Sequence, residues 1–250
     1  MSMTTHVLGI PIACTDYNSS VDQASRWAVE KESHYIIPAN VHVLMEAHDH
    51  RDYRQVLLQA DLVTPDGMPV VWMMRLKGQH HQPRVYGPDL MLQVLQAAAT
   101  HSIPVGFYGS APDVLETLVK KMLGRFPSLM VAYSYSPPFR SLSEEEDRGV
   151  VNDIESSGAR ILFVGLGCPR QEWWMYRHRG VVNAVMIGVG AAFDFLAGAK
   201  SQAPRWMQHA GLEWFFRWMT EPRRLGKRYL FTNPRFVGLA LVDWLGLGRF

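Results

Sequence analysis

The sequence predicts an α/β protein in which a parallel sheet is flanked by helices. Three segments share one plan: an apolar run of strand length, a glycine-rich turn and a helix-like stretch. Apolar strands that alternate with helices are typical of a parallel sheet that is buried on both faces. The chain has 250 residues, of which 48% are hydrophobic and 19% charged, so we expect a globular protein with a full core.

The first segment begins with the apolar run 103–108 and turns at Gly109 and Ser110. Pro112 stands where the first turn of a helix accepts a proline, and apolar residues follow at helical spacing: Leu115, Leu118, Val119 and Met122. The other two segments supply strands 161–164 and 184–187, turns 165–169 and 188–190, and helices 171–177 and 191–197. Such sheets bind ligands at the carboxyl ends of their strands, so we expect a site at these turns.

The stretches on either side extend this plan. Before it we expect a strand at 35–37, a turn at 38–40, a helix at about 41–48, a short strand at 62–64 and a turn at 65–67. A linker is expected at 137–143, before the acidic helix start at 144–146. After the third strand–turn–helix segment, one apolar helical stripe begins near residue 205 and comprises Met207, Ala210, Gly211, Trp214 and Trp218. The later apolar run 236–245 is too short to span a bilayer but is suited to lie in its surface.

Charge divides the chain into a core, residues 1–198, and a C-terminal appendage, residues 199–250. The appendage holds nine basic and three acidic residues, a net charge of +6, whereas the core holds 16 basic and 20 acidic residues, a net charge of −4. A basic, aromatic tail is suited to an anionic surface, and a basic helix that faces only solvent is the alternative.

Cysteine content and the N-terminal residues indicate the compartment. The two cysteines, Cys14 and Cys168, form neither a disulfide framework nor a CxxC pair. The first residues lack the basic and apolar regions of a signal peptide, and no stretch of about 18 apolar residues occurs. We therefore expect a cytoplasmic protein.

Two charged residues stand in turns that can carry chemistry. Asp66 follows strand 62–64, where a carboxylate can face a ligand and accept a proton, or can instead cap the next helix or form an Asx turn. Arg84 precedes the loop 85–90, where a guanidinium can bind phosphate or can form a surface salt bridge. The residues alone leave both choices open.

The turn 165–172 contains two glycines and the polar residues Arg170, Gln171 and Glu172. Glycines let a backbone approach a diphosphate, and a helix N-terminus favours negative charge. The histidine clusters at 48–50 and 80–81 do not resemble a metal-ligand set, because neighbouring residues on a helix point to different faces. No Asp-x-Asp pair occurs, the pair with which many nucleotide-sugar transferases hold a divalent cation on the diphosphate. If the ligand is a nucleotide-sugar, cationic side chains would have to neutralise its diphosphate instead.

Taken in order, these motifs resemble the WecG/TagA/CpsF family of bacterial glycosyltransferases, glycosyltransferase family 26. The matching stretches are 38–40, 64–68, 84–90, 164–172, 188–194, 203–206, 211–214 and 221–224, which together run from about residue 36 to 230. Two positions depart from the family pattern: Gln202 stands where an arginine is frequent, and Pro69 replaces a common glycine.

The resemblance implies a Rossmann-like core and an appendage that completes the active site and reaches the membrane. It implies inverting, metal-independent transfer from a UDP-sugar to a polyprenyl-diphosphate-linked saccharide, in cell-surface polysaccharide biosynthesis at the inner face of the cytoplasmic membrane. No cofactor, metal or nucleic acid is expected, and homo-oligomerisation is left open. A dinucleotide-dependent oxidoreductase and a non-enzymatic peripheral membrane scaffold are the alternatives. An oxidoreductase of this kind would carry a GxGxxG motif, which the sequence lacks, and it would leave the basic tail unexplained.

The resemblance also assigns residues. Asp66 matches the catalytic base and Arg84 a residue on the phosphate side of the site. The residues expected to bind substrates are Asn40, Thr64, Gly109, Gly167, Arg170, Gln171, Glu172, Asp194, Arg205, Arg217, Arg223 and Arg224.

Overall fold

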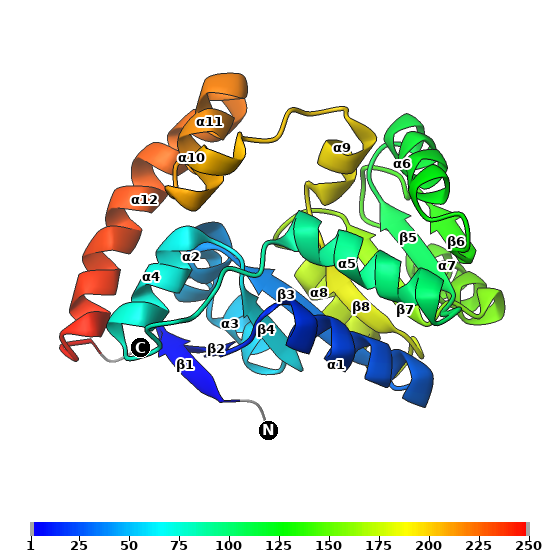
Figure 1. Cartoon of the computed structure of the whole chain (residues 1–250), viewed down its shortest axis with the longest axis horizontal. Coiled ribbons are helices and arrows are strands. Elements are labelled where there is room, and N and C mark those ends of the chain that lie inside the picture. Colours follow the sequence, from blue (N-terminus) through cyan, green and yellow to red (C-terminus); the bar gives the residue numbers. More distant parts are fainter. Residues whose placement is uncertain (1–2, 249–250) are drawn as a thin grey trace. The chain divides into compact units, whose positions relative to one another are not determined.

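The main element of the fold is a six-stranded sheet in the order β4-β3-β8-β7-β5-β6 (Figure 1). The structure, a computed structural model, describes residues 3–248 apart from the side chains of residues 227 and 228. The strands are β3 (His34–Ala39), β4 (Leu62–Pro65), β5 (Val105–Gly109), β6 (Val131–Tyr135), β7 (Ile161–Gly165) and β8 (Val185–Gly188). The pairs β3–β8, β8–β7, β7–β5 and β5–β6 are parallel, which confirms the predicted α/β fold.

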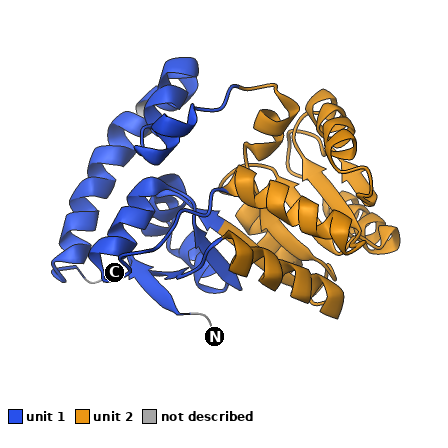
Figure 2. Cartoon of the chain, in the orientation of Figure 1, with its two compact units in different colours: residues 1–16, 38–86, 201–250 blue, residues 17–37, 87–200 orange. Residues whose placement is uncertain are grey.

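The chain forms two compact units, coloured separately in Figure 2, and each is described by itself. Unit 1 comprises residues 1–16, 38–86 and 201–250, and unit 2 comprises residues 17–37 and 87–200. The appendage thus packs with two earlier stretches of chain. The division of the sequence between residues 198 and 199 stays a prediction.

Unit 2 holds strands β5 to β8 and six helices. The helices are α1 (Tyr17–Glu30), α5 (Gly87–Thr100), α6 (Pro112–Arg125), α7 (Glu144–Ser157), α8 (Arg170–His178) and α9 (Ala192–Ala197). Helices α1, α5, α9 and α6 contact one another in series, and α1 and α5 lie in front of the strands in Figure 1. In its core, the Phe107 ring stacks on Phe163 at 5.7 Å and meets Phe193 edge-on at 5.9 Å. Each fully buried ring contributes about 1.5–3 kcal/mol to stability.

Unit 1 holds an antiparallel hairpin, β1 (Thr4–Val7) and β2 (Ile10–Ala13), together with β4 and the end of β3. Its helices are α2 (Val41–Asp49), α3 (Arg51–Leu58), α4 (Met68–Leu76), α10 (Arg205–His209), α11 (Glu213–Thr220) and α12 (Pro222–Trp244). Helix α12 packs against α2, α4 and α11.

Two residues of α12, Arg235 and Asp243, fix its C-terminal half within unit 1 by polar contacts. Asp243 accepts a hydrogen bond from the Leu8 amide at 2.9 Å and pairs with Lys77 Nζ at 2.7 Å. Arg235 donates to both carboxylate oxygens of Asp49, with Nη1 2.7 Å from Oδ2. None of the described helices is both long and apolar enough to cross a membrane.

Most predicted elements of the core are confirmed, with small differences at their ends. The linker at 137–143 ends at Ser143, which caps α7 in a reciprocal box with Glu146. The single helical stripe from residue 205 is wrong, because the helix is interrupted between α10 and α11. Gly211 has φ +70° there, and a Cβ at this position would lie 2.5 Å from the Trp72 ring. The basic residue Arg249, counted in the tail charge, lies outside the described residues, as do the side chains of Lys227 and Arg228.

Candidate active site

Asp66 lies in the turn between β4 and α4, at the carboxyl end of β4, and is 8% exposed. Its amide donates to the Ala39 carbonyl at 3.0 Å, which ties the turn to the end of β3. Asn40 Nδ2 donates to Asp66 Oδ2 at 3.2 Å. The N-cap of α4 is Gly67, so the alternative that Asp66 caps this helix is wrong.

Asn40 is itself held in place, because it caps α2. Its Oδ1 accepts hydrogen bonds from the amides of His42 at 3.0 Å and Val43 at 3.3 Å. One amide side chain therefore satisfies a helix N-terminus and orients the carboxylate of Asp66. A carboxylate at position 40 could not fill both roles, since it can accept from the helix but has no hydrogen to donate to Asp66.

Arg84 packs directly against Asp66. Its Nε donates to the Asp66 carbonyl, and its Nη2 lies 3.7 Å from Asp66 Oδ1. The guanidinium carbon stands 4.0 Å from the centre of the Tyr86 ring, and the side chain is 15% exposed. Arg84 thus forms ion pairs, as the salt-bridge alternative expected, but they are largely buried and not on the surface. Its binding of phosphate stays a prediction.

Glu213, at the start of α11, completes a cluster that the sequence prediction of site residues did not include. Its Oε2 accepts from Arg84 Nη2 at 2.7 Å, and its Oε1 accepts from the Tyr86 hydroxyl at 3.1 Å. Gln202 Nε2 donates to the same hydroxyl at 3.3 Å. We call Asp66, Arg84 and Glu213 the carboxylate–arginine cluster.

Burial and charge fix the protonation states around this cluster. Burial alone would lower the pKa of Arg84, but the carboxylates of Asp66 and Glu213 raise it by more, so the pKa lies above its ordinary value. Burial, followed by the charge of Glu213, raises the pKa of the Tyr86 hydroxyl far above its usual range. Arg84 therefore remains a cation and Tyr86 a neutral hydrogen-bond donor at any working pH.

Unit 2, described by itself, contains the turns that follow β5 and β7. The crossovers from β5 to β6 and from β7 to β8 run in opposite directions along the sheet. Right-handed crossovers of opposite direction place their helices on opposite faces, which makes the point between β5 and β7 a switch point, where open α/β sheets bind ligands. Gly109 has φ +123° there, and a Cβ would lie 2.6 Å from the Gly165 carbonyl carbon, so only glycine allows this approach.

Gln171 and Glu172 join the neighbouring turns of unit 2. Gln171 Oε1 accepts from the amides of Gly167 at 3.1 Å and Gly190 at 3.0 Å, and its Nε2 donates to Glu172 Oε1 at 2.7 Å. Both residues are buried: Gln171 is 5% exposed and Glu172 is 0% exposed. The structure thus gives them a role in shaping the turns, and direct contact with a substrate stays a prediction.

The other predicted residues lie in different surroundings. Thr64 is fully buried, and its Oγ1 has no hydrogen-bond partner among the described residues. Asp194 pairs with Lys200 at 2.6 Å, and Arg224 pairs with Glu221 at 2.6 Å. Exposed positions are occupied by Arg170, Arg205 and Arg223, whereas Arg217 is half-buried.

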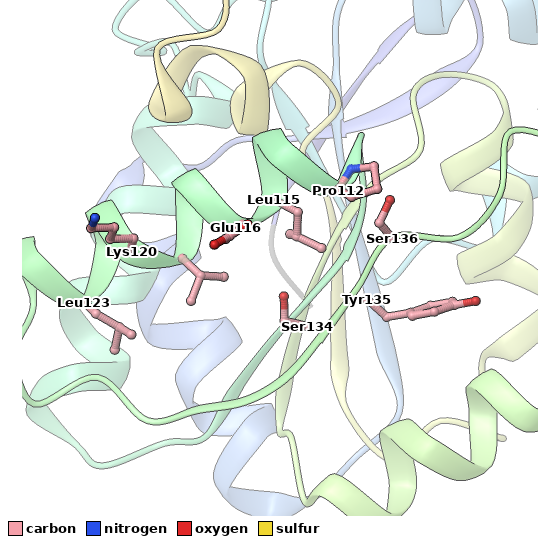
Figure 3. Close-up of a pocket in the computed structure, with 9 residues that line it drawn as sticks. Pro112, Leu115, Glu116, Lys120, Leu123, Ser134, Tyr135 and Ser136 are labelled. Atoms are coloured by element: carbon pink, nitrogen blue, oxygen red, sulfur yellow. The ribbon is translucent and has the colours of Figure 1, made fainter.

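A shallow groove in unit 2 runs between α6 and β6 (Figure 3). Leu115 and Lys120 of α6 line one side, and Ser134, Tyr135 and Ser136 line the other. None of the site residues predicted from the sequence lines this groove. In the part of the chain that the structure describes, no three His, Cys, Asp or Glu side chains gather as a metal-ion cluster.

Comparison with known proteins gives one consistent result. The sequence model described as the glycosyl transferase WecG/TagA/CpsF family matches residues 5–249. Two relatives carry the name N-acetylglucosaminyldiphosphoundecaprenol N-acetyl-beta-D-mannosaminyltransferase. The protein from Bacillus spizizenii is 32% identical over 83% of this chain and 78% of its own, and that from Bacillus subtilis is 30% identical over 96% and 92%. A Staphylococcus aureus protein of the same name is 27% identical over 88% of this chain and 86% of its own.

Proposed function

Because the chain belongs to the WecG/TagA/CpsF family of glycosyl transferases, we propose that it transfers a sugar from a UDP-sugar to a polyprenyl-diphosphate-linked saccharide. The protein is a glycosyltransferase, which sets aside both an oxidoreductase and a non-enzymatic scaffold. The observation that carries the proposed chemistry is the buried carboxylate of Asp66, oriented by Asn40 and flanked by Arg84.

The reaction is a single displacement. Asp66 accepts the proton of the acceptor hydroxyl while the hydroxyl oxygen bonds to the anomeric carbon of the donor sugar. The bond from that carbon to the diphosphate oxygen breaks, and its electron pair leaves with UDP. Attack on the face opposite UDP inverts the anomeric configuration.

Charge that develops on the departing diphosphate requires compensation. In the proposal arginines supply positive charge to the diphosphate without a divalent metal. The candidates are Arg84 and the appendage residues Arg205, Arg217, Arg223 and Arg224. One preorganised donor of this kind is typically worth about 3 kcal/mol of transition-state stabilisation.

The names of the relatives support a particular substrate pair. Both Bacillus proteins are named for transfer of N-acetylmannosamine to N-acetylglucosaminyldiphosphoundecaprenol. We take UDP-N-acetylmannosamine as the first donor to test and a lipid-linked N-acetylglucosaminyl diphosphate as the first acceptor.

A screen of UDP-sugars for release of UDP, with a short polyprenyl-diphosphate-N-acetylglucosamine as acceptor, tests the proposed function. We expect release with one UDP-sugar in the presence of acceptor and little release without it. EDTA should leave the rate within about twofold, because the arginines take the place of a metal ion. Release that requires Mg²⁺ would contradict the metal-independent step, and no release with any UDP-sugar would contradict the donor class.

The lipid-linked acceptor requires the enzyme to reach a membrane surface, and unit 1 offers a surface for this. Helices α10 to α12 expose both apolar side chains and the basic residues Arg223 and Arg224. Among the apolar ones are Trp206, Trp214, Phe215, Met219, Leu230, Phe231, Val237 and Leu241. Apolar side chains and arginines together bind anionic membranes, each basic residue adding roughly 1 kcal/mol. We therefore propose peripheral binding to the inner face of the cytoplasmic membrane through α10 to α12.

Replacing Phe231 with Ser is expected to weaken binding to anionic vesicles about tenfold, because a Phe side chain contributes about 1.5–3 kcal/mol on burial. Co-sedimentation with phosphatidylglycerol vesicles measures the effect. Phe139, which is 80% exposed in the loop before α7, provides the matched control, since Phe231 is 76% exposed. Equal binding by Phe231→Ser and wild type, or an equal loss in Phe139→Ser, would contradict this membrane surface.

A further inference from the structure

Glu213 has a position that the proposed reaction does not yet use. We infer that Glu213 is a positioning residue, which holds the Arg84 guanidinium against Asp66 and offsets its charge so that Asp66 stays basic enough to take a proton. The inference rests on the proposed role of Asp66 as the base. It assigns to the appendage a contribution to the proton-transfer step.

Three groups hold the Arg84 guanidinium in place: the Asp66 carbonyl, the Glu213 carboxylate and the Tyr86 ring. We call this arrangement the clamp. The Asp66 carbonyl accepts from Nε, Glu213 accepts from Nη2 at 2.7 Å, and the Tyr86 ring lies 4.0 Å from the guanidinium carbon. Tyr86 in turn donates to the other oxygen of Glu213 at 3.1 Å. Both carboxylate oxygens of Glu213 are therefore engaged by the residues that enclose the cation.

Glu213 is also the part of this clamp that comes from the appendage. It is the first residue of α11, 129 positions after Arg84 in the sequence, and its side chain is 17% exposed. The turn at Gly211, set against Trp72, fixes where α11 begins. The exposed residues Trp214 and Phe215 follow directly on the same helix, so the helix that holds Arg84 also belongs to the proposed membrane surface.

The charge balance gives the clamp a chemical consequence. A guanidinium within about 4 Å of a carboxylate lowers the pKa of that carboxyl by one to three units and makes it a weaker base. In the cluster one guanidinium faces two carboxylates, at 3.7 Å for Asp66 and 2.7 Å for Glu213. Glu213 thus offsets the charge of Arg84. Two neutral groups, the amide of Asn40 and the hydroxyl of Tyr86, also act on Asp66.

The experiment removes the charge of Glu213 while keeping its shape. In Glu213→Gln, Asp66 faces an uncompensated guanidinium, so its pKa should fall by on the order of one unit and the acid limb of the kcat/KM profile should move to lower pH by the same amount. We expect kcat to fall about tenfold, because a weaker base removes the proton less readily, while KM for the UDP-sugar changes less than about threefold. Glu213→Asp keeps the charge and should leave the acid limb in place.

Glu46→Gln is the matched control, since Glu46 is a half-buried carboxylate of unit 1 that pairs with His50 at 3.3 Å. An unmoved acid limb in Glu213→Gln, or an equal shift in Glu46→Gln, would overturn the inference. Titration of the Asp66 carboxyl by NMR in the ligand-free protein, its signal identified by its loss in Asp66→Asn, provides a reading independent of turnover. If wild type transfers no sugar, the proposed function fails, while the NMR titration of Glu213→Gln still decides whether Glu213 controls Asp66.

Discussion

Replacing Asp66 with Asn is expected to lower kcat by at least ~100-fold, within the usual contribution of a general base. The amide retains the shape of the carboxylate but cannot take the proton of the acceptor hydroxyl. Because Asp66 is held by Asn40 and by its own backbone amide, the variant should keep its fold. UDP release with donor and acceptor measures the loss, and thermal melting measures the fold.

Asp52→Asn is the matched control, because Asp52 is an exposed carboxylate of α3 in the same unit. It should keep turnover within about twofold, as surface substitutions generally change stability little. Near-wild-type turnover of Asp66→Asn would remove Asp66 from the role of base. A large loss of melting temperature in that variant would instead show that the carboxylate holds the turn after β4 together.

The second large effect is expected at Arg84. Arg84→Met removes the cation that lies between the carboxylates of Asp66 and Glu213. The side chains of Arg84 and Glu213 are only 15% and 17% exposed, and breaking such a buried ion pair costs about 3 kcal/mol of unfolding free energy. Turnover should fall by on the order of 100-fold, the loss typical of removing one preorganised charged donor. Urea denaturation and steady-state kinetics measure the two effects separately.

The double variant Arg84→Met, Glu213→Gln separates stability from catalysis. It leaves Asp66 as the single charged residue of the carboxylate–arginine cluster. Compared with Arg84→Met alone, it should therefore regain part of the lost unfolding free energy without regaining turnover. Arg51→Met, at an exposed position of α3, should change unfolding free energy by less than about 0.5 kcal/mol. Full recovery of turnover in the double variant would contradict a catalytic contribution from Arg84.

The sequence predicted the buried strands of the sheet because they are apolar runs bounded by glycine-rich turns. It did not predict β6, Val131–Tyr135, because this edge strand is only partly buried and alternates polar with aromatic residues. It placed one helical stripe where the chain makes two helices, since the close approach of Gly211 to Trp72 is a tertiary contact without a local signal.

The site was predictable to a similar degree. Asp66 and Arg84 stand in turns, where chemistry is readily suspected, and the structure brings them into contact, with Arg84 Nη2 3.7 Å from Asp66 Oδ1. Glu213 lies far along the chain, and no spacing connects it to Arg84. The structural role of Gln171 was equally hidden, because the hydrogen bonds that it accepts from the amides of Gly167 and Gly190 depend on how two turns meet at the edge of the sheet.

The most direct measurement is a crystal structure of Asp66→Asn with a UDP-sugar and a lipid-diphosphate acceptor analogue bound. If the carboxylate at position 66 is the base, the side-chain amide should lie about 2.6–3.2 Å from the attacking hydroxyl, on the face of the sugar opposite UDP. A side chain at position 66 turned away from that hydroxyl, with another basic group in its place, would contradict the account.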